Sequence, residues 1–131
     1  MMNEQVSGIM TKNLVTLQAQ DTVQTAKEIM VSKRIQHIPV VDGDSLIGLI
    51  SIQDLFKSNL NQSDYANTKV ETMMTKKLAT LEPTDKIGTA AEVFMEHLFH
   101  ALPVVENGKL LGLVTTFDIL RYEYEKEYPS R

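Results

Sequence analysis

The sequence contains two copies of one segment. Residues 6–57 align with residues 70–121 at a constant shift of 64 positions (74 minus 10), without a gap, so that Met10-Thr11-Lys12 returns as Met74-Thr75-Lys76. Roughly a third of the aligned positions are identical, and about a third of the others exchange one apolar residue for another. A cleft between two such copies has two nearly equivalent walls. The repeat therefore favours a paired binding site over a single asymmetric catalytic centre.

Each copy predicts an α/β unit with the element order β-α-β-β-α. A short strand at residues 14–17, matched by residues 78–81, is followed by a helix. Asp21 and Asp85 are the expected N-caps of these helices. Apolar residues three or four positions apart predict the buried helix faces, which are Val23, Ala26 and Met30 in the first copy and Ile87, Ala90, Phe94 and Leu98 in the second.

An apolar hairpin follows each first helix. In the first copy the strands at residues 38–41 and 46–51 flank Asp42-Gly43-Asp44, and Glu106-Asn107-Gly108 forms the corresponding turn sequence in the second copy. Gly48 and Gly112 interrupt the second strand at the same position, which indicates a close approach of the backbone there. A second helix is expected to begin near residue 51 and near residue 115.

Composition excludes several classes of function. The chain has 131 residues, a formal net charge of −4 and no stripe of Lys or Arg, so nucleic-acid binding is not expected. It contains no cysteine, which excludes disulfides, thiolate–zinc sites and thiol catalysis. Because no apolar run has membrane-spanning length and the N-terminus lacks a signal-peptide pattern, we expect a cytoplasmic protein that contacts no membrane.

The strongest site candidates are two S/T-x-x-D steps at the second strand-to-helix junction, Ser51 with Asp54 and Thr115 with Asp118. One interpretation is a capping box, in which hydroxyl and carboxylate satisfy free backbone N–H groups. The other is a ligand site. A helix N-terminus suits a phosphate, and a carboxylate beside it can accept hydrogen bonds from ribose hydroxyls. The step follows a buried strand and occurs in both copies, which favours the ligand interpretation.

The ordered set of motifs resembles the CBS domain, a family named after cystathionine β-synthase. The set comprises the Met-Thr-Lys opening, a short strand ending in Thr, PVVDG, LIGLIS and the S/T-x-x-D step. Two copies in tandem resemble a stand-alone CBS pair, or Bateman module. The predicted organisation is repeat 1 at residues 6–57, a linker at 58–69, repeat 2 at 70–121 and a tail at 122–131, with the repeats packed with pseudo-twofold symmetry.

The resemblance implies an adenosine-containing ligand, such as AMP, ADP, ATP with or without magnesium, S-adenosylmethionine or a dinucleotide. The ligand would lie in the cleft between the copies. Asp54 and Asp118 would hold ribose hydroxyls, and Ser51 and Thr115 would face phosphate.

In this family the S/T-x-x-D step of one copy joins the first strand of the other. Ser51 and Asp54 would therefore pair with Ala79 and Thr80, and Thr115 and Asp118 with Val15 and Thr16. The residues before each Pro-Val-Val would lie along the base of the site, namely His37, Ile38, Ala101 and Leu102. His37 is also a candidate phosphate contact, although a backbone-bonded histidine at a strand start is an equal alternative.

The predicted function is that of a regulatory sensor, which signals to an unknown protein target or through its own assembly. No nucleophile, P-loop or metal-ligand pattern is visible, so we expect neither enzymatic activity, nor a metal site, nor a required cofactor. The resemblance also implies a homodimer formed through helical faces. The alternative is a structural or oligomerisation adaptor without a ligand, and a weaker rival is an enzyme that acts on nucleotides.

Overall fold

The structure is a computed structural model that describes residues 2–129. The last two residues of the predicted tail, 130 and 131, lie outside the described residues. Among the described residues, no helix is both long and apolar enough to cross a membrane. The elements follow the order η1 (Val6–Gly8), α1 (Val23–Lys33), β1 (His37–Asp42), β2 (Ser45–Ser51), α2 (Ile52–Lys57), η2 (Gln62–Asn67), η3 (Val70–Thr72), α3 (Ile87–His97), β3 (Ala101–Glu106), β4 (Lys109–Thr115) and α4 (Thr116–Glu127).

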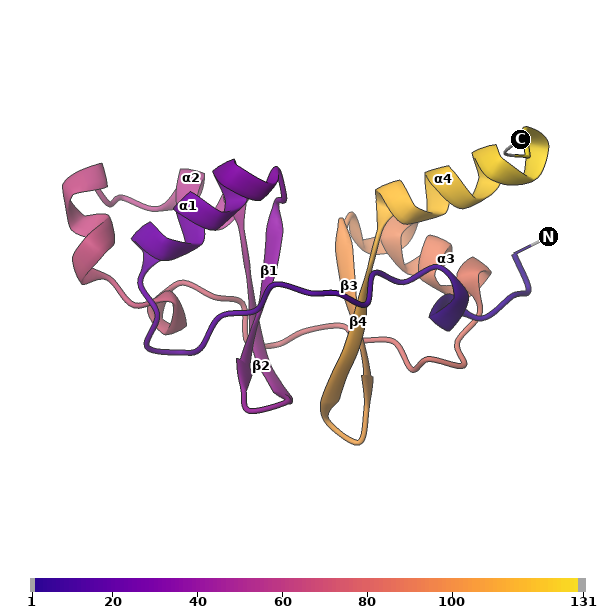
Figure 1. Ribbon diagram of the computed structural model, residues 1–131, viewed down its shortest axis with the longest axis horizontal. Coiled ribbons are helices and arrows are strands. Elements are labelled where there is room, and N and C mark those ends of the chain that lie inside the picture. Colours follow the sequence, from indigo (N-terminus) through magenta and orange to yellow (C-terminus); the bar gives the residue numbers. More distant parts are fainter. Residues whose placement is uncertain (1, 130–131) are drawn as a thin grey trace. The chain divides into compact units, whose positions relative to one another are not determined.

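Two compact units divide the chain. One unit contains Leu14–Leu78, and the other combines Met1–Asn13 with Ala79–Arg131. In each unit an antiparallel hairpin, β1–β2 or β3–β4, packs with helices (Figure 1). This arrangement confirms the predicted mixed α/β fold.

Each unit takes its opening segment from the neighbouring sequence copy. The Val6 N–H donates to the Asp85 carbonyl at 2.8 Å, and the Ile87 N–H donates to the Glu4 carbonyl at the same distance. In the other unit, Val70 and Val23 donate in the same manner to the carbonyls of Asp21 and Thr68. The opening segments therefore supply acceptors at the first turns of α1 and α3, where N–H groups have no partner within the helix.

The predicted aspartate N-caps are wrong. Thr22 caps α1 and accepts from the Thr25 N–H at 3.1 Å, while Lys86 precedes α3 without a side-chain cap. Asp21 and Asp85 instead close the preceding turns, where they accept from the N–H groups of residues 18 and 82. The backbone carbonyls described above already accept from the first N–H groups of both helices. The two carboxylates therefore bond to the turns that precede the helices.

The predicted first strands shrink to single parallel bridges, Leu17 with Val40 and Leu81 with Val104. Leu17 donates to the Pro39 carbonyl and accepts from the Val41 N–H. Extending this parallel ladder toward residue 15 would require an N–H donor at Pro39, which proline lacks. Pro103 imposes the same limit in the second copy.

The predicted helix faces are largely confirmed. Val23, Ala26 and Met30 are buried in α1, and Ile87, Ala90 and Phe94 are buried in α3. Leu98, which was expected in the core, is 78% exposed. It lies at the end of α3 in the left-handed conformation, with φ of 55°, so its side chain leaves the buried face.

The close approach predicted at the two strand glycines is confirmed. A Cβ at Gly112 would lie 2.6 Å from Met10 Sδ and 3.0 Å from the Thr11 carbonyl oxygen. At Gly48 the nearest atoms all belong to the Met74 side chain. Each methionine comes from an opening segment, so the repeated Met-Thr-Lys motif packs onto the second strand of a hairpin.

Candidate functional site

Both S/T-x-x-D steps form complete capping boxes. Ser51 Oγ accepts from the Asp54 N–H at 3.3 Å, and Asp54 Oδ2 accepts from the Ser51 N–H at 2.8 Å. Thr115 and Asp118 form the same pair of bonds, at 3.2 and 2.8 Å. The capping interpretation is therefore observed in both copies. It uses one carboxylate oxygen of each aspartate and leaves the other oxygen for a further partner.

The second oxygen has different surroundings in the two copies. Asp118 Oδ1 accepts from Arg121 Nη2 at 3.0 Å, and Asp118 Oδ2 also accepts from the Thr115 hydroxyl at 3.1 Å. Asp118 is only 4% exposed. Asp54 is half-buried, and within residues 2–129 its Oδ1 accepts no hydrogen bond. The two carboxylates thus differ in availability.

The hairpins bring the residues before Pro-Val-Val to these steps. His37 is the cross-strand partner of Ser51, and Ala101 is the partner of Thr115. The side chains of Ile38 and Leu102 are fully buried in the two hydrophobic cores. A ligand can therefore meet Ile38 and Leu102 only through their backbone atoms.

The remaining predicted residues flank the bridge positions. Val15 and Thr16 precede Leu17 in the Leu14–Leu78 unit, which also holds the Ser51–Asp54 step. Residues 79 and 80 precede Leu81 in the unit that holds the Thr115–Asp118 step. The predicted sites join residues of different units, so this pairing stays a prediction.

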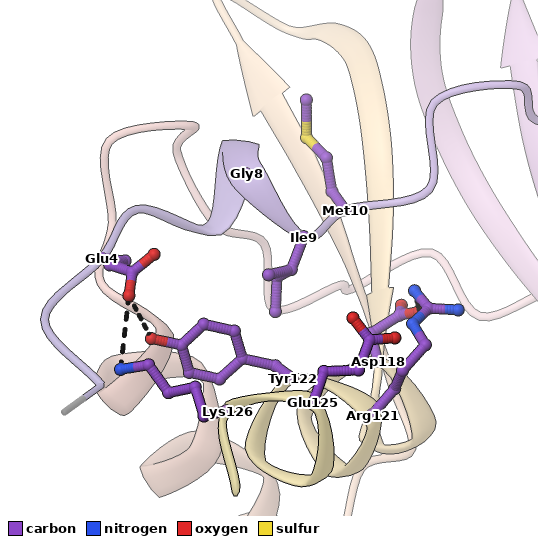
Figure 2. Close-up of a pocket in the computed structure, with 9 residues that line it drawn as sticks. All are labelled: Glu4, Gly8, Ile9, Met10, Asp118, Arg121, Tyr122, Glu125 and Lys126. Atoms are coloured by element: carbon purple, nitrogen blue, oxygen red, sulfur yellow. Dashed lines mark hydrogen bonds and ion pairs between the residues drawn. The ribbon is translucent and has the colours of Figure 1, made fainter. Parts of the chain in front are cut away.

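A groove of about 530 Å³ runs along α4 (Figure 2). One side is the opening segment, with Glu4, Gly8, Ile9 and Met10. The other side is the helix face that carries Asp118, Arg121, Tyr122, Glu125 and Lys126. The lining combines an apolar patch with charges of both signs.

Glu4 connects the opening segment to α4 through side-chain contacts, which the dashed lines of Figure 2 show. The Tyr122 hydroxyl donates to Glu4 Oε1 at 2.6 Å, and Lys126 Nζ lies 3.3 Å from the same oxygen. The bond from Tyr122, together with that from Lys126, lowers the pKa of Glu4 below its ordinary value of 4.5. The contacts with Tyr122 and Glu4 raise the pKa of Lys126.

Sequence reasoning missed the partners of α4. The Arg121–Asp118 pair has a spacing of three residues on a helix, a pattern that could have indicated it. The Glu4–Tyr122 bond joins residues 118 positions apart, and no local pattern announces such a contact. Within the described residues, no group of three His, Cys, Asp or Glu side chains is placed to hold a metal ion.

Comparison with known proteins identifies the repeated unit. The family model of the CBS domain matches residues 6–61 and 70–125. A homoserine O-acetyltransferase from Methanococcus vannielii is 39% identical over 116 residues, which cover 87% of this chain and 24% of that enzyme. The chain spans less than half the length of the first curated relatives that it matches.

Two solved structures match over almost their full length. CBSX2 in complex with AMP is 29% identical, with a TM-score of 0.84, and the match covers 95% of this chain and 98% of CBSX2. A proposed acetoin utilization protein (AcuB) from Vibrio cholerae is 26% identical with the same TM-score, over 97% of this chain and 98% of that protein. Both predicted features, the fold and the tandem arrangement of repeats, are confirmed by these matches.

Proposed function

This chain belongs to the CBS domain family, and we propose that it is a regulatory module that binds an adenosine nucleotide, AMP, ADP or ATP, rather than an enzyme. The observation that carries the proposal is the match to CBSX2, a protein of nearly the same extent that was crystallised with AMP. The doubled S/T-x-x-D step supports it, because the step leaves a carboxylate oxygen beside a hairpin end in the Leu14–Leu78 unit.

The chemistry of this step suits a nucleoside. An ionised carboxylate only accepts hydrogen bonds, and the ribose of AMP offers two neighbouring hydroxyl donors. His37, opposite Ser51 on β1, supplies a second polar side chain at the same hairpin end. We propose that Asp54 accepts from the ribose and that His37 and Ser51 lie toward the phosphate. We also propose a cytoplasmic location, where such nucleotides are available.

Calorimetric titration of the purified chain with AMP, ADP and ATP, each with and without magnesium, tests the proposal. We expect heat of binding for at least one nucleotide and chemical-shift changes at the Ser51 and Asp54 amides. Absence of both at millimolar ligand would contradict nucleotide binding and would favour the adaptor alternative.

We further propose that the chain signals as a homodimer formed through α4. Three apolar or aromatic side chains lie on one stripe of this helix, and Tyr128, just after its last residue, continues their spacing of three and four residues. Each of the four is between 60% and 66% exposed: Phe117, Leu120, Tyr124 and Tyr128. A stripe of this kind on a surface helix is typical of a docking face.

Charge complementarity favours a second copy as the occupant. Arg121 and Glu125 flank the stripe on one side, nearly symmetric about its middle. A twofold pairing of antiparallel helices would therefore bring Arg121 toward the second copy's Glu125, and the reverse. Arg121 keeps guanidinium N–H groups for this contact beyond the one bonded to Asp118.

Light scattering across a range of concentrations tests the dimer. We expect a mass near twice 14.8 kDa for the wild type and a monomer for Tyr124→Asp. Glu125→Arg should weaken the dimer, and the double variant Arg121→Glu with Glu125→Arg should restore it. A wild type that stays at 14.8 kDa, or a dimer unaffected by Tyr124→Asp, would contradict this interface.

A further inference from the structure

We infer that the two S/T-x-x-D steps are not equivalent: the Asp54 step is the tighter nucleoside site, and Arg121 closes the Asp118 step to ligand. The inference rests on the proposed nucleotide binding and specifies which half of the repeat performs it. It assigns Arg121 the role of a specificity-determining residue that blocks a site by acting on Asp118.

Both oxygens of Asp118 already accept hydrogen bonds from α4 and its N-cap residue. Its Oδ2 takes the N–H and the hydroxyl of Thr115, and its Oδ1 takes Arg121 Nη2 at 3.0 Å. The Asp118 side chain is 5% exposed, whereas that of Arg121 is 46% exposed. A ribose hydroxyl can reach Asp118 Oδ1 only after the guanidinium has moved away.

Arg121 has a second contact that keeps it in place. Its guanidinium carbon lies 5.6 Å from the centre of the Phe117 ring, in a cation–π arrangement. Both side chains are specific to the second copy. The equivalent positions in the first copy, 64 residues earlier, hold Lys57 and Gln53.

The first copy therefore leaves its carboxylate open. Within residues 2–129, Lys57 forms no ion pair with Asp54, and Asp54 Oδ1 accepts no hydrogen bond. A lysine cannot reproduce the planar fork of an arginine, and a glutamine at position 53 offers no ring for a cation. A nucleoside that bonds to Asp54 Oδ1 thus breaks no hydrogen bond within residues 2–129, whereas one at Asp118 Oδ1 must break a charge-assisted contact.

This difference predicts the stoichiometry of binding. The second site should bind about tenfold more weakly, because a ligand must first break the Arg121–Asp118 contact. A charge-assisted hydrogen bond contributes more free energy than the amount that corresponds to a tenfold change in affinity, and partial screening by solvent reduces that contribution here. AMP should therefore bind in one tight step per chain, followed by a weaker second step.

Five single variants, titrated calorimetrically with AMP and with adenosine, test the assignment. Asp54→Asn should weaken the tight step tenfold or more, and Asp118→Asn should leave it within about twofold. Arg121→Gln should strengthen the second step about tenfold, because Asp118 Oδ1 becomes available. Lys57→Gln is the matched control, since it removes the same charge at the equivalent position and should not strengthen the second step. A melting curve of each variant verifies folding, and Arg121→Ala repeats the test of Arg121 with a different side chain.

Three results would overturn the inference. Two binding steps of equal affinity in the wild type would show that Arg121 does not block the second site. Loss of the tight step in Asp118→Asn would place the tight site in the second copy and not in the first. Weaker AMP binding but unchanged adenosine binding in Arg121→Gln would make Arg121 a phosphate partner instead. Absence of binding by the wild type is a distinct result, because it contradicts the proposed function itself.

Discussion

The two copies are alike in the hydrogen bonds of the S/T-x-x-D step and differ in the helix that follows it. Both steps close the same capping box, with the same backbone bond of 2.8 Å to the aspartate. Beyond the step, α2 ends at Lys57, whereas α4 continues to Glu127 and carries Arg121. The repeated motif therefore determines the local geometry, and the residues after it determine which further hydrogen bonds each carboxylate accepts within the chain.

A second difference lies beneath the hairpins. Both strand glycines face the methionine of an opening segment, but the three atoms nearest to an added Cβ all belong to the Met74 side chain at Gly48, whereas at Gly112 they include the Thr11 carbonyl oxygen. A flexible methionine can move away from an added methyl group more readily than a backbone carbonyl can. The unit that contains α4 should therefore tolerate less change in its hairpin than the Leu14–Leu78 unit.

The largest predicted effect follows from this contrast. Gly112→Ala should destabilise the protein by about 2 kcal/mol through overpacking, and Gly48→Ala by about 1 kcal/mol or less. Urea unfolding of the two variants, followed by circular dichroism, measures both values. If Gly48→Ala were the more damaging change, the two hairpins would not differ in the manner described.

Removal of each capping carboxylate measures how much the two S/T-x-x-D steps differ in their contribution to stability. Asp118→Ala loses bonds from the Thr115 N–H, the Thr115 hydroxyl and Arg121, whereas Asp54→Ala loses the Ser51 N–H. We expect a loss of about 2 kcal/mol for Asp118→Ala and about 1 kcal/mol for Asp54→Ala, in the range of lost helix caps. Equal losses in chemical denaturation would show that Arg121 adds nothing to the step.

The smallest predicted effect concerns acid. Tyr122, and then Lys126, lower the pKa of Glu4 below 4.5. Their contribution to the stability of the folded protein is therefore complete above that pH and is lost as the pH falls through the folded-state pKa. The equivalent position, 64 residues later in the Leu14–Leu78 unit, is Thr68, which cannot ionise. Glu4→Gln should therefore melt slightly earlier at pH 7 and lose less stability between pH 7 and pH 3 than the wild type. Identical acid sensitivity of the two proteins would contradict this prediction. Because Glu4 is exposed, added salt should reduce the difference.

Local patterns predicted most of the fold. Apolar residues three or four positions apart located the helices, and apolar runs around turn sequences located the hairpins. The S/T-x-x-D spacing located both capping boxes. The same patterns failed where long-range contacts intervene. Asp21 was an expected helix cap, but the Thr68 carbonyl serves the first N–H of α1 instead. The strand expected at residues 14–17 is limited to Leu17, because Pro39 cannot donate to the ladder.

The candidate site was predictable as a set of residues but not as an electrostatic environment. The motif predicts the same role for Asp54 and Asp118. The structure shows that Arg121 turns back toward Asp118 and lies over the Phe117 ring, while within residues 2–129 Lys57 forms no ion pair with Asp54. A long side chain on a helix has many rotamers, so its partner depends on the neighbours that the fold provides.

Titration of the wild type and of Asp54→Asn with AMP and with 2′-deoxy-AMP tests directly whether Asp54 holds the nucleoside. If Asp54 accepts the ribose 2′-hydroxyl, removal of that hydroxyl should weaken wild-type binding about tenfold and should leave binding by Asp54→Asn almost unchanged. The two changes would then be coupled, as expected for groups in contact. Equal affinity of the wild type for both nucleotides, or full discrimination by Asp54→Asn, would contradict the assignment of Asp54 as the residue that holds the nucleoside.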